Sequence, residues 1–379
     1  MKVVRLKLKN WLNFREVDVP LTDRCYLLGP NAAGKSNFLD VFRFLRDVAK
    51  TNGGGLQKAV NDRGGIKKLR CLQARRDPVV RIEVHLEDNQ TKWEYALAFQ
   101  SEGKGAQKLV VIEESVVKDN MVLVIRPDKH DVQDGLRLTQ TYLEQINANQ
   151  SFRPLSEFFS ATTYLHLVPQ LLRFGEKIAI RAMEDDPFGQ GFLERLAKTQ
   201  DRTRVSRLKR IEKTLTAALP QFRELQFIKD EAGKPHLQAR YEHWRPSAGW
   251  QTEEQFSDGT LRLIGLLWSM MDGDNLLLLE EPELSLNDAI VEKIPLMIDR
   301  IQKQSKQRRQ VLISTHSEAL LKSPIDANGV LLLEPTDKGT RVRQPDSAEK
   351  KMLDCGLTVA EVILPKARPQ LTLQGTLFD

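Results

Sequence analysis

The feature that most constrains the fold is a glycine-rich loop at residues 29–36, which reads Gly-Pro-Asn-Ala-Ala-Gly-Lys-Ser. A short apolar segment, residues 25–28, precedes the loop, and residues 35–49 follow it with helical periodicity. Glycine lets the backbone turn tightly and bring its N–H groups close to an anion, and the N-terminus of the helix adds its dipole. The order strand, glycine loop, helix therefore predicts an α/β fold built around a phosphate-binding loop.

The residue types in this loop indicate how a nucleotide is held. We expect Lys35 to neutralise the β- and γ-phosphates and the Ser36 hydroxyl to ligate Mg²⁺. A chance glycine turn before a helix is the alternative, and the flanking strand and helix argue against it. The expected nucleotide contacts of this segment are Gly29, Pro30, Asn31, Ala32, Ala33, Gly34, Lys35, Ser36 and Asn37.

A second motif begins with four leucines at residues 276–279, which continue into Glu280, Glu281 and Pro282. The leucines predict a buried strand with two carboxylates emerging at its end. In such an acidic strand end, the first carboxylate holds Mg²⁺ and the second polarises the attacking water, which assigns these roles to Glu280 and Glu281. An ordinary strand with an acidic turn is the alternative, and the glycine loop favours the functional interpretation.

Two further segments carry polar groups next to expected helices or strands. His316 follows an apolar strand at residues 311–313, where an imidazole can sense or stabilise charge that develops on a γ-phosphate. Ser257, Asp258 and Gly259 precede a helix expected at residues 259–271, and a serine before a helix N-terminus is a second anion-binding device. A structural histidine and a plain helix cap are the alternatives.

Along the chain the order is glycine loop, Ser257–Gly259, the acidic strand end and His316. In this order the four motifs resemble those of ABC-type ATPases, and the chain is similar to their SMC/RecF-like branch, closest to the AAA ATPases of OLD-type phage-defence proteins. The resemblance covers roughly residues 1–335 and implies ATP and Mg²⁺ as cofactors. It implies that Ser257, Asp258 and Gly259 contact ATP bound to a second subunit, in a head-to-tail homodimer, while Glu281 and His316 act in cis.

The resemblance also implies that Gln170 is the glutamine that reaches the metal ion. Three positions depart from the family pattern. Glu280 stands where Asp is usual, Asp258 where Gly is usual, and Asn287 where the Asp after the acidic strand is expected. These departures predict slow hydrolysis more than weak nucleotide binding.

The expected architecture is an ABC-ATPase-like α/β head with a P-loop core, an antiparallel β meander in lobe I and a short helical insertion. Period-two runs predict the meander at residues 79–86, 93–99, 109–117 and 121–125. We divide the chain into lobe I at 1–175, a basic helical insertion at 176–220, lobe II at 221–335 and a C-terminal extension at 336–379. Helices are expected at 139–160, broken by Pro154, and at 288–303, and residues 190–219 are expected to form one long helix or a helical pair.

Basic residues gather in three clusters on a chain with a net charge of +6 and a pI of about 9.1. Residues 195–213 contain eight Lys or Arg and two acidic residues, with Val205, Leu208, Ile211 and Leu215 as an apolar stripe. Solvated helix faces or a surface for an acidic protein are the alternatives to DNA or RNA contact. The other two clusters are Lys67, Lys68, Arg70, Arg75 and Arg76, and Lys303, Lys306, Arg308 and Arg309.

The remaining features restrict the class of protein. No apolar run has membrane-spanning length and no signal peptide is expected, which favours the cytoplasm. Three widely spaced cysteines predict neither disulfides nor a metal site. No nuclease module is expected after lobe II, so if the defence role that the resemblance implies applies, a nuclease or other effector has to be a separate protein. The segment from Gln374 to Phe378 resembles peptides that dock on bacterial sliding clamps, with Leu377 and Phe378 filling an apolar pocket. A tail that packs on its own domain or on another partner is the alternative.

Three functions remain open on the sequence alone. The first is an ATP-driven switch in a prokaryotic anti-phage defence complex that controls a separate nuclease or toxin. The second is a RecF-like repair or recombination ATPase that binds DNA directly. The third is a non-catalytic nucleotide-binding scaffold, which Glu280 and Asn287 favour.

Overall fold

The structure is a computed structural model that describes residues 1–74, 77–102, 108–175, 185–242, 249–304 and 308–367. Its chain divides into two compact units, one formed by Met1–Ser160 with Pro324–Asp379 and the other by Ala161–Ser323. The four-segment division of the sequence stays a prediction. The clamp-like segment 374–378 lies outside the described ranges, as do Arg75, Arg76 and Lys306.

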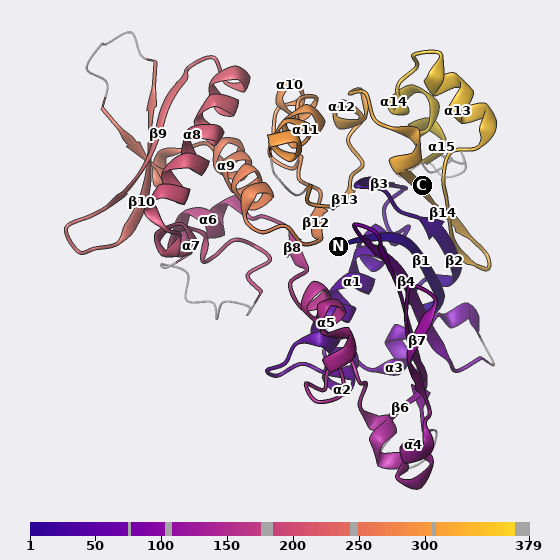
Figure 1. Ribbon diagram of the computed structural model, residues 1–379. Helices are drawn as coiled ribbons and strands as arrows, with labels where there is room; N and C mark the ends of the chain where they lie inside the picture. Colours follow the sequence, from indigo (N-terminus) through magenta and orange to yellow (C-terminus); the bar gives the residue numbers. More distant parts are fainter. Residues whose placement is uncertain (75–76, 103–107, 176–184, 243–248, 305–307, 368–379) are drawn as a thin grey trace, which may run out of the picture. The chain divides into compact units, whose positions relative to one another are not determined.

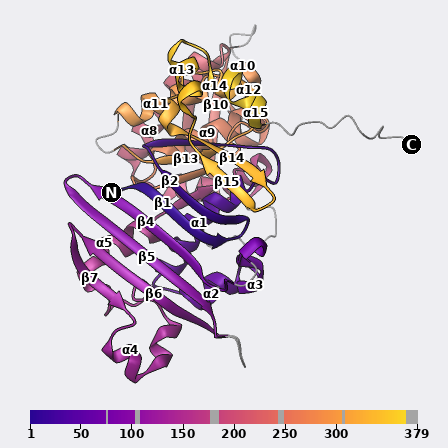
Figure 2. The ribbon, with the colours of Figure 1, turned by 90° about the vertical axis from the view of Figure 1, so that its right-hand side faces the viewer.

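The first unit contains a six-stranded antiparallel sheet in the order β2-β1-β4-β5-β6-β7. Figure 2 shows its strands β4–β7 nearly face on, with α4 beyond the ends of β6 and β7. Alternating burial along β4 matches the period-two pattern that predicted the meander. The strands are β1 Lys2–Trp11, β2 Phe14–Pro20, β4 Val80–Asp88, β5 Thr91–Ser101, β6 Leu109–Lys118 and β7 Met121–Arg126.

Aromatic side chains join this sheet to helix α1 (Lys35–Ala49), which begins at the glycine loop. The Phe44 ring of α1 stacks on that of Phe99, with 5.5 Å between the ring centres. It also makes a T-shaped contact with Trp11, with 5.1 Å between the ring centres. All three rings are fully buried. Burial of large apolar side chains is the main stabilising contribution, so this packing fixes the start of α1 relative to the sheet.

Strand β3 (Arg24–Leu28) leads into the glycine loop and pairs in parallel with β14 (Val330–Thr336), which pairs antiparallel with β15 (Gly339–Arg343). The helices of this unit follow α1 as short segments: α2 Leu56–Asn61, α3 Ile66–Leu69, α4 Lys129–Gln133, α5 Arg153–Ser160, α13 Ser347–Asp354, α14 Val359–Val362 and α15 Leu364–Ala367. Its 3-10 turns are Leu72–Ala74, Gly135–Thr139, Gln150–Phe152 and Ala327–Gly329.

A buried carboxylate ties α13 to its surroundings. Glu349 is 1% exposed and accepts hydrogen bonds from Arg343 (2.7 Å), Lys366 (2.8 Å) and the Asp346 backbone N–H (2.7 Å). The guanidinium of Arg343 is the largest of the influences that lower the pKa of Glu349 from 4.5 to about 2. The ionised form is therefore the one that the folded state stabilises.

Glu349→Gln is expected to lower the free energy of unfolding by about 1–3 kcal/mol near neutral pH, because the donors around this buried carboxyl group lose a charged acceptor. The contribution of Glu349 is present above its unfolded pKa of 4.5 and is lost as the pH falls toward 2. Urea unfolding at about pH 6 and about pH 3.5 should show that the free energy of unfolding falls less on acidification in the variant than in wild type. Glu224→Gln, at a more exposed site, is the control. A fall in the free energy of unfolding of Glu349→Gln as steep as in wild type would contradict this assignment.

The second unit places three parallel strands side by side. β12 (Leu277–Glu280) lies between β13 (Val311–Ser314) and β8 (Thr163–Leu165), with Leu277 opposite Val311 and Glu280 opposite Ser314. The strands are almost entirely buried, as continuous apolar runs in a parallel sheet require. Helices α9 (Asp258–Met271), α10 (Asp288–Val291), α11 (Ile294–Gln304) and α12 (Glu318–Leu321) accompany them.

The described residues between β8 and α9 form the helices α6, α7 and α8 and a small antiparallel sheet (Figure 1). The sheet has the order β11-β10-β9, and α8 packs on β9. Among the described residues, no helix has both the length and the apolar character that crossing a membrane requires. The elements are α6 Pro169–Phe174, α7 Phe192–Lys198, α8 Asp201–Ala218, β9 Phe222–Lys229, β10 Pro235–Tyr241, β11 Gln251–Thr252 and the 3-10 turn Glu253–Gln255.

Three local expectations differ from the structure. Pro154 opens α5 instead of breaking a helix, because proline lacks only an N–H that the first turn leaves unpaired. The helix expected at 288–303 is two helices, α10 and α11. Val205 is 61% exposed and does not belong to the buried stripe of α8, which consists of Leu208, Ile211, Leu215 and Ala218.

Candidate functional site

The glycine loop lies between β3 and α1, and two of its glycines are required by their surroundings. A side chain at Gly29 would place its Cβ 2.7 Å from the Leu333 carbonyl oxygen. Gly34 has a φ of 98°, and a Cβ there would lie 2.2 Å from Nδ2 of Asn13. Only glycine fits this left-handed backbone and this close approach, so the loop geometry follows from the two glycines that the sequence pattern requires.

Lys35 is 8% exposed and its ammonium group lies in the curve of the loop. Its Nζ donates to the carbonyl oxygens of Gly29 (2.9 Å) and Pro30 (3.2 Å). Ser36 is exposed on the first turn of α1, next to the N–H groups at the helix start. The loop therefore gathers a cation, a hydroxyl and a helix N-terminus, which is the chemistry that phosphate binding requires.

Asn13 holds the loop from outside through hydrogen bonds, and no sequence pattern marks it. Its Nδ2 donates to the Ala33 carbonyl (2.8 Å) and to Thr340 Oγ1 (2.7 Å), and its Oδ1 accepts from Nδ2 of Asn37 (2.8 Å). The amide of Asn37, predicted as a nucleotide contact, thus bonds to Asn13. Asn13 lies in the tight turn between β1 and β2, where its role depends on tertiary structure alone.

In the second unit the acidic strand end meets the histidine. Because β12 and β13 are parallel and Glu280 is opposite Ser314, the residues after each strand emerge at the same edge. Oε1 of Glu281 lies 3.1 Å from Nδ1 of His316, and the Glu281 N–H donates to the Ser314 carbonyl (3.0 Å). Glu281 has a φ of 44°, a strained conformation of the kind that clusters at functional sites. The carboxylate that we predicted as general base therefore has a hydrogen-bonding imidazole beside it.

Glu280 accepts a hydrogen bond from the hydroxyl of Tyr164 on the neighbouring strand β8. Mg²⁺ prefers oxygen ligands, and in nucleotide sites it takes one or two protein ligands beside phosphates and water. The carboxylate of Glu280 and the hydroxyl of Ser36 match that donor chemistry. In the part of the chain that the structure describes, no three His, Cys, Asp or Glu side chains form a metal cluster.

Glu283 is a functional neighbour that sequence reasoning missed. It is 6% exposed, and its Oε1 accepts from Thr315 Oγ1 (2.5 Å) and from the His316 N–H (3.3 Å). Burial raises the pKa of its carboxyl group. The glutamate holds the turn that presents His316, so the acidic strand end orients the histidine as well as contacting it. The available sequence signal was that Glu283 is the third acidic residue within the four positions 280–283.

Ser257 caps α9, with its Oγ accepting from the Thr260 N–H (3.2 Å). Gly259 lies against the segment that follows β12, since a Cβ there would be 2.9 Å from the Ser285 carbonyl oxygen. Ser257 is exposed at the start of a 14-residue helix. We refer to Ser257–Gly259 as the signature turn. Its exposed serine and helix start suit an anion that approaches from outside.

The Asp258 carboxylate of this turn is held from two sides by α6. Nε2 of Gln170 donates to its Oδ2 (3.0 Å) and Nη2 of Arg173 to its Oδ1 (2.7 Å). Gln170, predicted as a metal ligand, thus bonds to the signature turn, and its metal role stays a prediction. Arg173 also donates to the carbonyls of Phe256 (2.6 Å) and Glu253 (3.3 Å). The position of Arg173, three residues after Gln170 on α6, was the only sequence signal.

Arg173→Ala is expected to reduce kcat for ATP hydrolysis about five- to tenfold, because the turn loses an ion pair and two backbone contacts that fix its shape. The Kd for ATP should change less than about twofold, since Arg173 is not a predicted nucleotide contact. Steady-state kinetics and calorimetric titration measure the two quantities, with Arg223→Ala as an exposed-arginine control. A matching rise in Kd would contradict a purely positioning role.

The segment after β12 is also fixed by buried contacts. Arg262 is 4% exposed and donates to the carbonyls of Leu284 (2.8 Å) and Leu167. Asn287 caps α10, its Oδ1 accepting from the Ala289 N–H (2.9 Å). Asparagine is among the favoured helix-capping residues, so this departure from the family pattern has a structural explanation.

These features define a class of protein, the ABC-type ATPase head. They are a P-loop between a strand and a helix, an acidic strand end paired with a histidine, and a capped signature turn. The chain has the fold of SMC heads. It superposes on an SMC head bound to the C-winged helix domain of ScpA with a TM-score of 0.54 at 14% identity, covering 93% of this chain and 100% of that one.

A second SMC head, from Pyrococcus furiosus and bound to the C-terminal domain of ScpA, gives a TM-score of 0.50 at 13% identity over 93% of this chain and 98% of that one. The profile of the family described as "AAA domain, putative AbiEii toxin, Type IV TA system" matches residues 26–322. The chain therefore belongs to this family of AAA-domain proteins. Comparison with curated protein sequences gives no match. The predicted fold class, an ABC-ATPase-like α/β head with an antiparallel meander, is confirmed.

Proposed function

We propose that the chain is an ATP-binding and ATP-hydrolysing switch that works as a homodimer and controls a separate effector protein. The observation that carries the proposal is the Glu281–His316 pair, 3.1 Å apart at the ends of two parallel strands. A carboxylate beside an imidazole at a strand end can act as the base that activates water once a nucleotide places its γ-phosphate there.

In this proposal the roles fall to residues whose local geometry suits them. Lys35 exchanges its contacts with the Gly29 and Pro30 carbonyls for β- and γ-phosphate oxygens, and Ser36 and Glu280 hold Mg²⁺. The metal supplies charge stabilisation on the phosphates when it is bound. Glu281 accepts the proton of the attacking water, and His316 orients this carboxylate and stabilises developing charge. A slow turnover is proposed because Glu280 is longer than the usual aspartate.

The signature turn is proposed to complete the site of a second copy of the chain. Support comes from the exposed Ser257 at the start of α9 and from the bonds that hold Asp258 in place. If two chains are needed, turnover per chain rises with protein concentration until the dimer saturates. Initial rates across a wide concentration range test this, and a turnover per chain that stays constant throughout would contradict a composite site.

A cytoplasmic role in anti-phage defence is proposed from the resemblance to OLD-type ATPases. The family description, which names a putative toxin of a toxin–antitoxin system, supports a setting of this kind. The two SMC heads bind a domain of another protein, which supports a protein partner here by analogy. A stable partner, nuclease or toxin, that co-purifies in an ATP-dependent manner is the expected result. DNA cleavage by the purified chain alone would contradict the separate effector.

The alternative of a RecF-like repair ATPase requires direct contact with DNA, and the arginine-rich surface of α8 is the observation that favours it. The alternative of a non-catalytic scaffold requires that ATP is bound and never hydrolysed. Measurable turnover that Glu281→Gln abolishes excludes the scaffold. Absence of nucleic-acid binding at low salt excludes the repair ATPase.

A further inference from the structure

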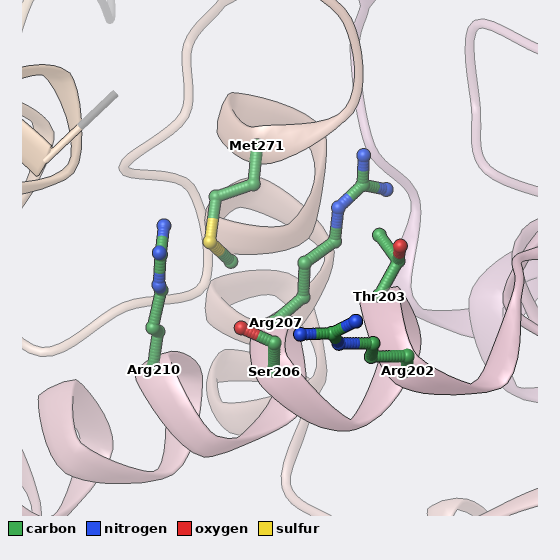
Figure 3. Close-up of a pocket in the computed structure, with 6 residues that line it drawn as sticks. All are labelled: Arg202, Thr203, Ser206, Arg207, Arg210 and Met271. Carbon is green, nitrogen blue, oxygen red and sulfur yellow. The ribbon is translucent and has the colours of Figure 1, made fainter. Parts of the chain in front are cut away.

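A groove of about 310 Å³ lies between α8 and the end of α9 (Figure 3). Three guanidinium groups and two hydroxyl groups face it, and Met271 closes the side that belongs to α9. In Figure 3, Ser206 lies on the helical turn between Arg202 and Arg210. The lining residues are Arg202, Thr203, Ser206, Arg207, Arg210 and Met271.

The cations of α8 separate into two kinds. Arg204 donates to the Thr199 carbonyl (2.9 Å) and lies 4.2 Å from the centre of the Phe227 ring. Arg207 pairs with Asp272 (2.8 Å) and lies over Trp268. These two arginines hold α8 to its neighbours. The remaining cations are exposed and have no side-chain partner among the described residues: Arg202, Lys209, Arg210 and Lys213.

The exposed cations lie on the face of α8 opposite its buried stripe. They occupy positions i, i+7, i+8 and i+11, so they extend over about 16 Å of helix at 1.5 Å per residue. The acidic residues of α8 do not compensate them, since Asp201 pairs with Arg204 (2.6 Å) and Glu212 accepts from the Leu225 N–H (2.9 Å). We call this row, with the groove, the α8 face.

The structure also weakens one competing cluster. Arg309 is 3% exposed and donates to the carbonyls of Asn275 (2.7 Å), Ser269 and Asp272. Burial lowers the pKa of Arg309 to about 10. This arginine is a structural residue, so the basic cluster at 303–309 loses a cation that we expected on its surface.

We propose that the α8 face binds the phosphate backbone of a nucleic acid without reading its sequence. A row of unpaired cations about 16 Å long faces about five phosphates of one strand, whereas a small anion would occupy a single position. Arginine forks bind phosphate oxygens in bidentate fashion, and hydroxyl groups such as those of Thr203 and Ser206 are common phosphate donors. The inference goes beyond the proposed function, because binding here needs neither ATP nor a second chain.

The test compares the full chain with Arg202→Glu/Arg210→Glu. Fluorescence anisotropy with labelled 30-nucleotide duplex DNA, single-stranded DNA and RNA measures Kd over a salt series. The double variant is expected to raise Kd about tenfold or more and to lower the slope of log K against log salt by about 2. The charge-matched control Lys229→Glu/Lys303→Glu, with both lysines exposed in the same unit, should change Kd less than about twofold.

ATP turnover and thermal stability of the double variant are expected to match wild type, so loss of binding is separable from failure of the ATPase or of the fold. Three results would overturn the proposal: no binding of any oligonucleotide by wild type at low salt, an equal loss in the control variant, or a Kd unchanged in the double variant. Binding of polyglutamate in place of the oligonucleotides would also overturn it and would assign the α8 face to an acidic protein.

Discussion

Replacing Glu281 by Gln is expected to reduce kcat for ATP hydrolysis about 10²- to 10⁴-fold, the usual contribution of a general base. The amide keeps the size of the side chain and can still bond to Nδ1 of His316, but it cannot accept the proton of the attacking water. ATP should therefore stay bound and unhydrolysed. Phosphate release under saturating ATP measures kcat, and filter binding measures the retained nucleotide.

Glu292→Gln is the matched control, because Glu292 is exposed and has no assigned role in hydrolysis. Its kcat should stay within about twofold of wild type. A Glu281→Gln variant that hydrolyses ATP at the wild-type rate would remove Glu281 from the mechanism and leave the pair with His316 as a structural contact.

Lys35→Ala is expected to weaken ATP binding by about 100-fold or more, because the β- and γ-phosphates lose a charge-assisted contact in a site of low exposure. The loop itself should survive, since its shape depends on Gly29, Gly34 and Asn13. Calorimetric titration with ATP and Mg²⁺ measures Kd, and thermal unfolding without nucleotide checks that the fold is intact.

Lys50→Ala is the control for the loss of one lysine, since Lys50 follows α1 and lies outside the glycine loop. A Lys35→Ala variant that binds ATP as tightly as wild type would place the nucleotide elsewhere in the chain. A variant that fails to bind ATP but also unfolds early would assign Lys35 to the stability of the loop.

Patterns that repeat along the chain allowed much of the fold to be predicted. Period-two alternation located β4 to β7 to within a few residues, and the helical period with its preceding glycine located α1. Both signals are local, because they follow from which side of an element faces the core. Glu281 and His316 each come shortly after an apolar run in the sequence. These runs form the parallel strands β12 and β13, whose register brings the two residues together.

The misses have a common physical cause. Asn13, Arg173 and Glu283 act through single side chains whose partners lie far away in the sequence or in an irregular turn, and no periodic pattern marks them. The same holds for Arg309, which looks like a surface cation in sequence and is buried among backbone carbonyls. Sequence patterns record which face is buried, and they do not record which polar group meets which.

The most direct test of the central claim is the mass of Glu281→Gln in solution with ATP and Mg²⁺, measured by light scattering during size-exclusion chromatography. If the ATP site of one chain is completed by the signature turn of another, the variant should elute as a dimer with ATP and as a monomer without it. Adding Ser257→Arg should return it to the monomer while ATP stays bound. A Glu281→Gln chain that retains ATP and stays monomeric at every protein concentration would contradict the account.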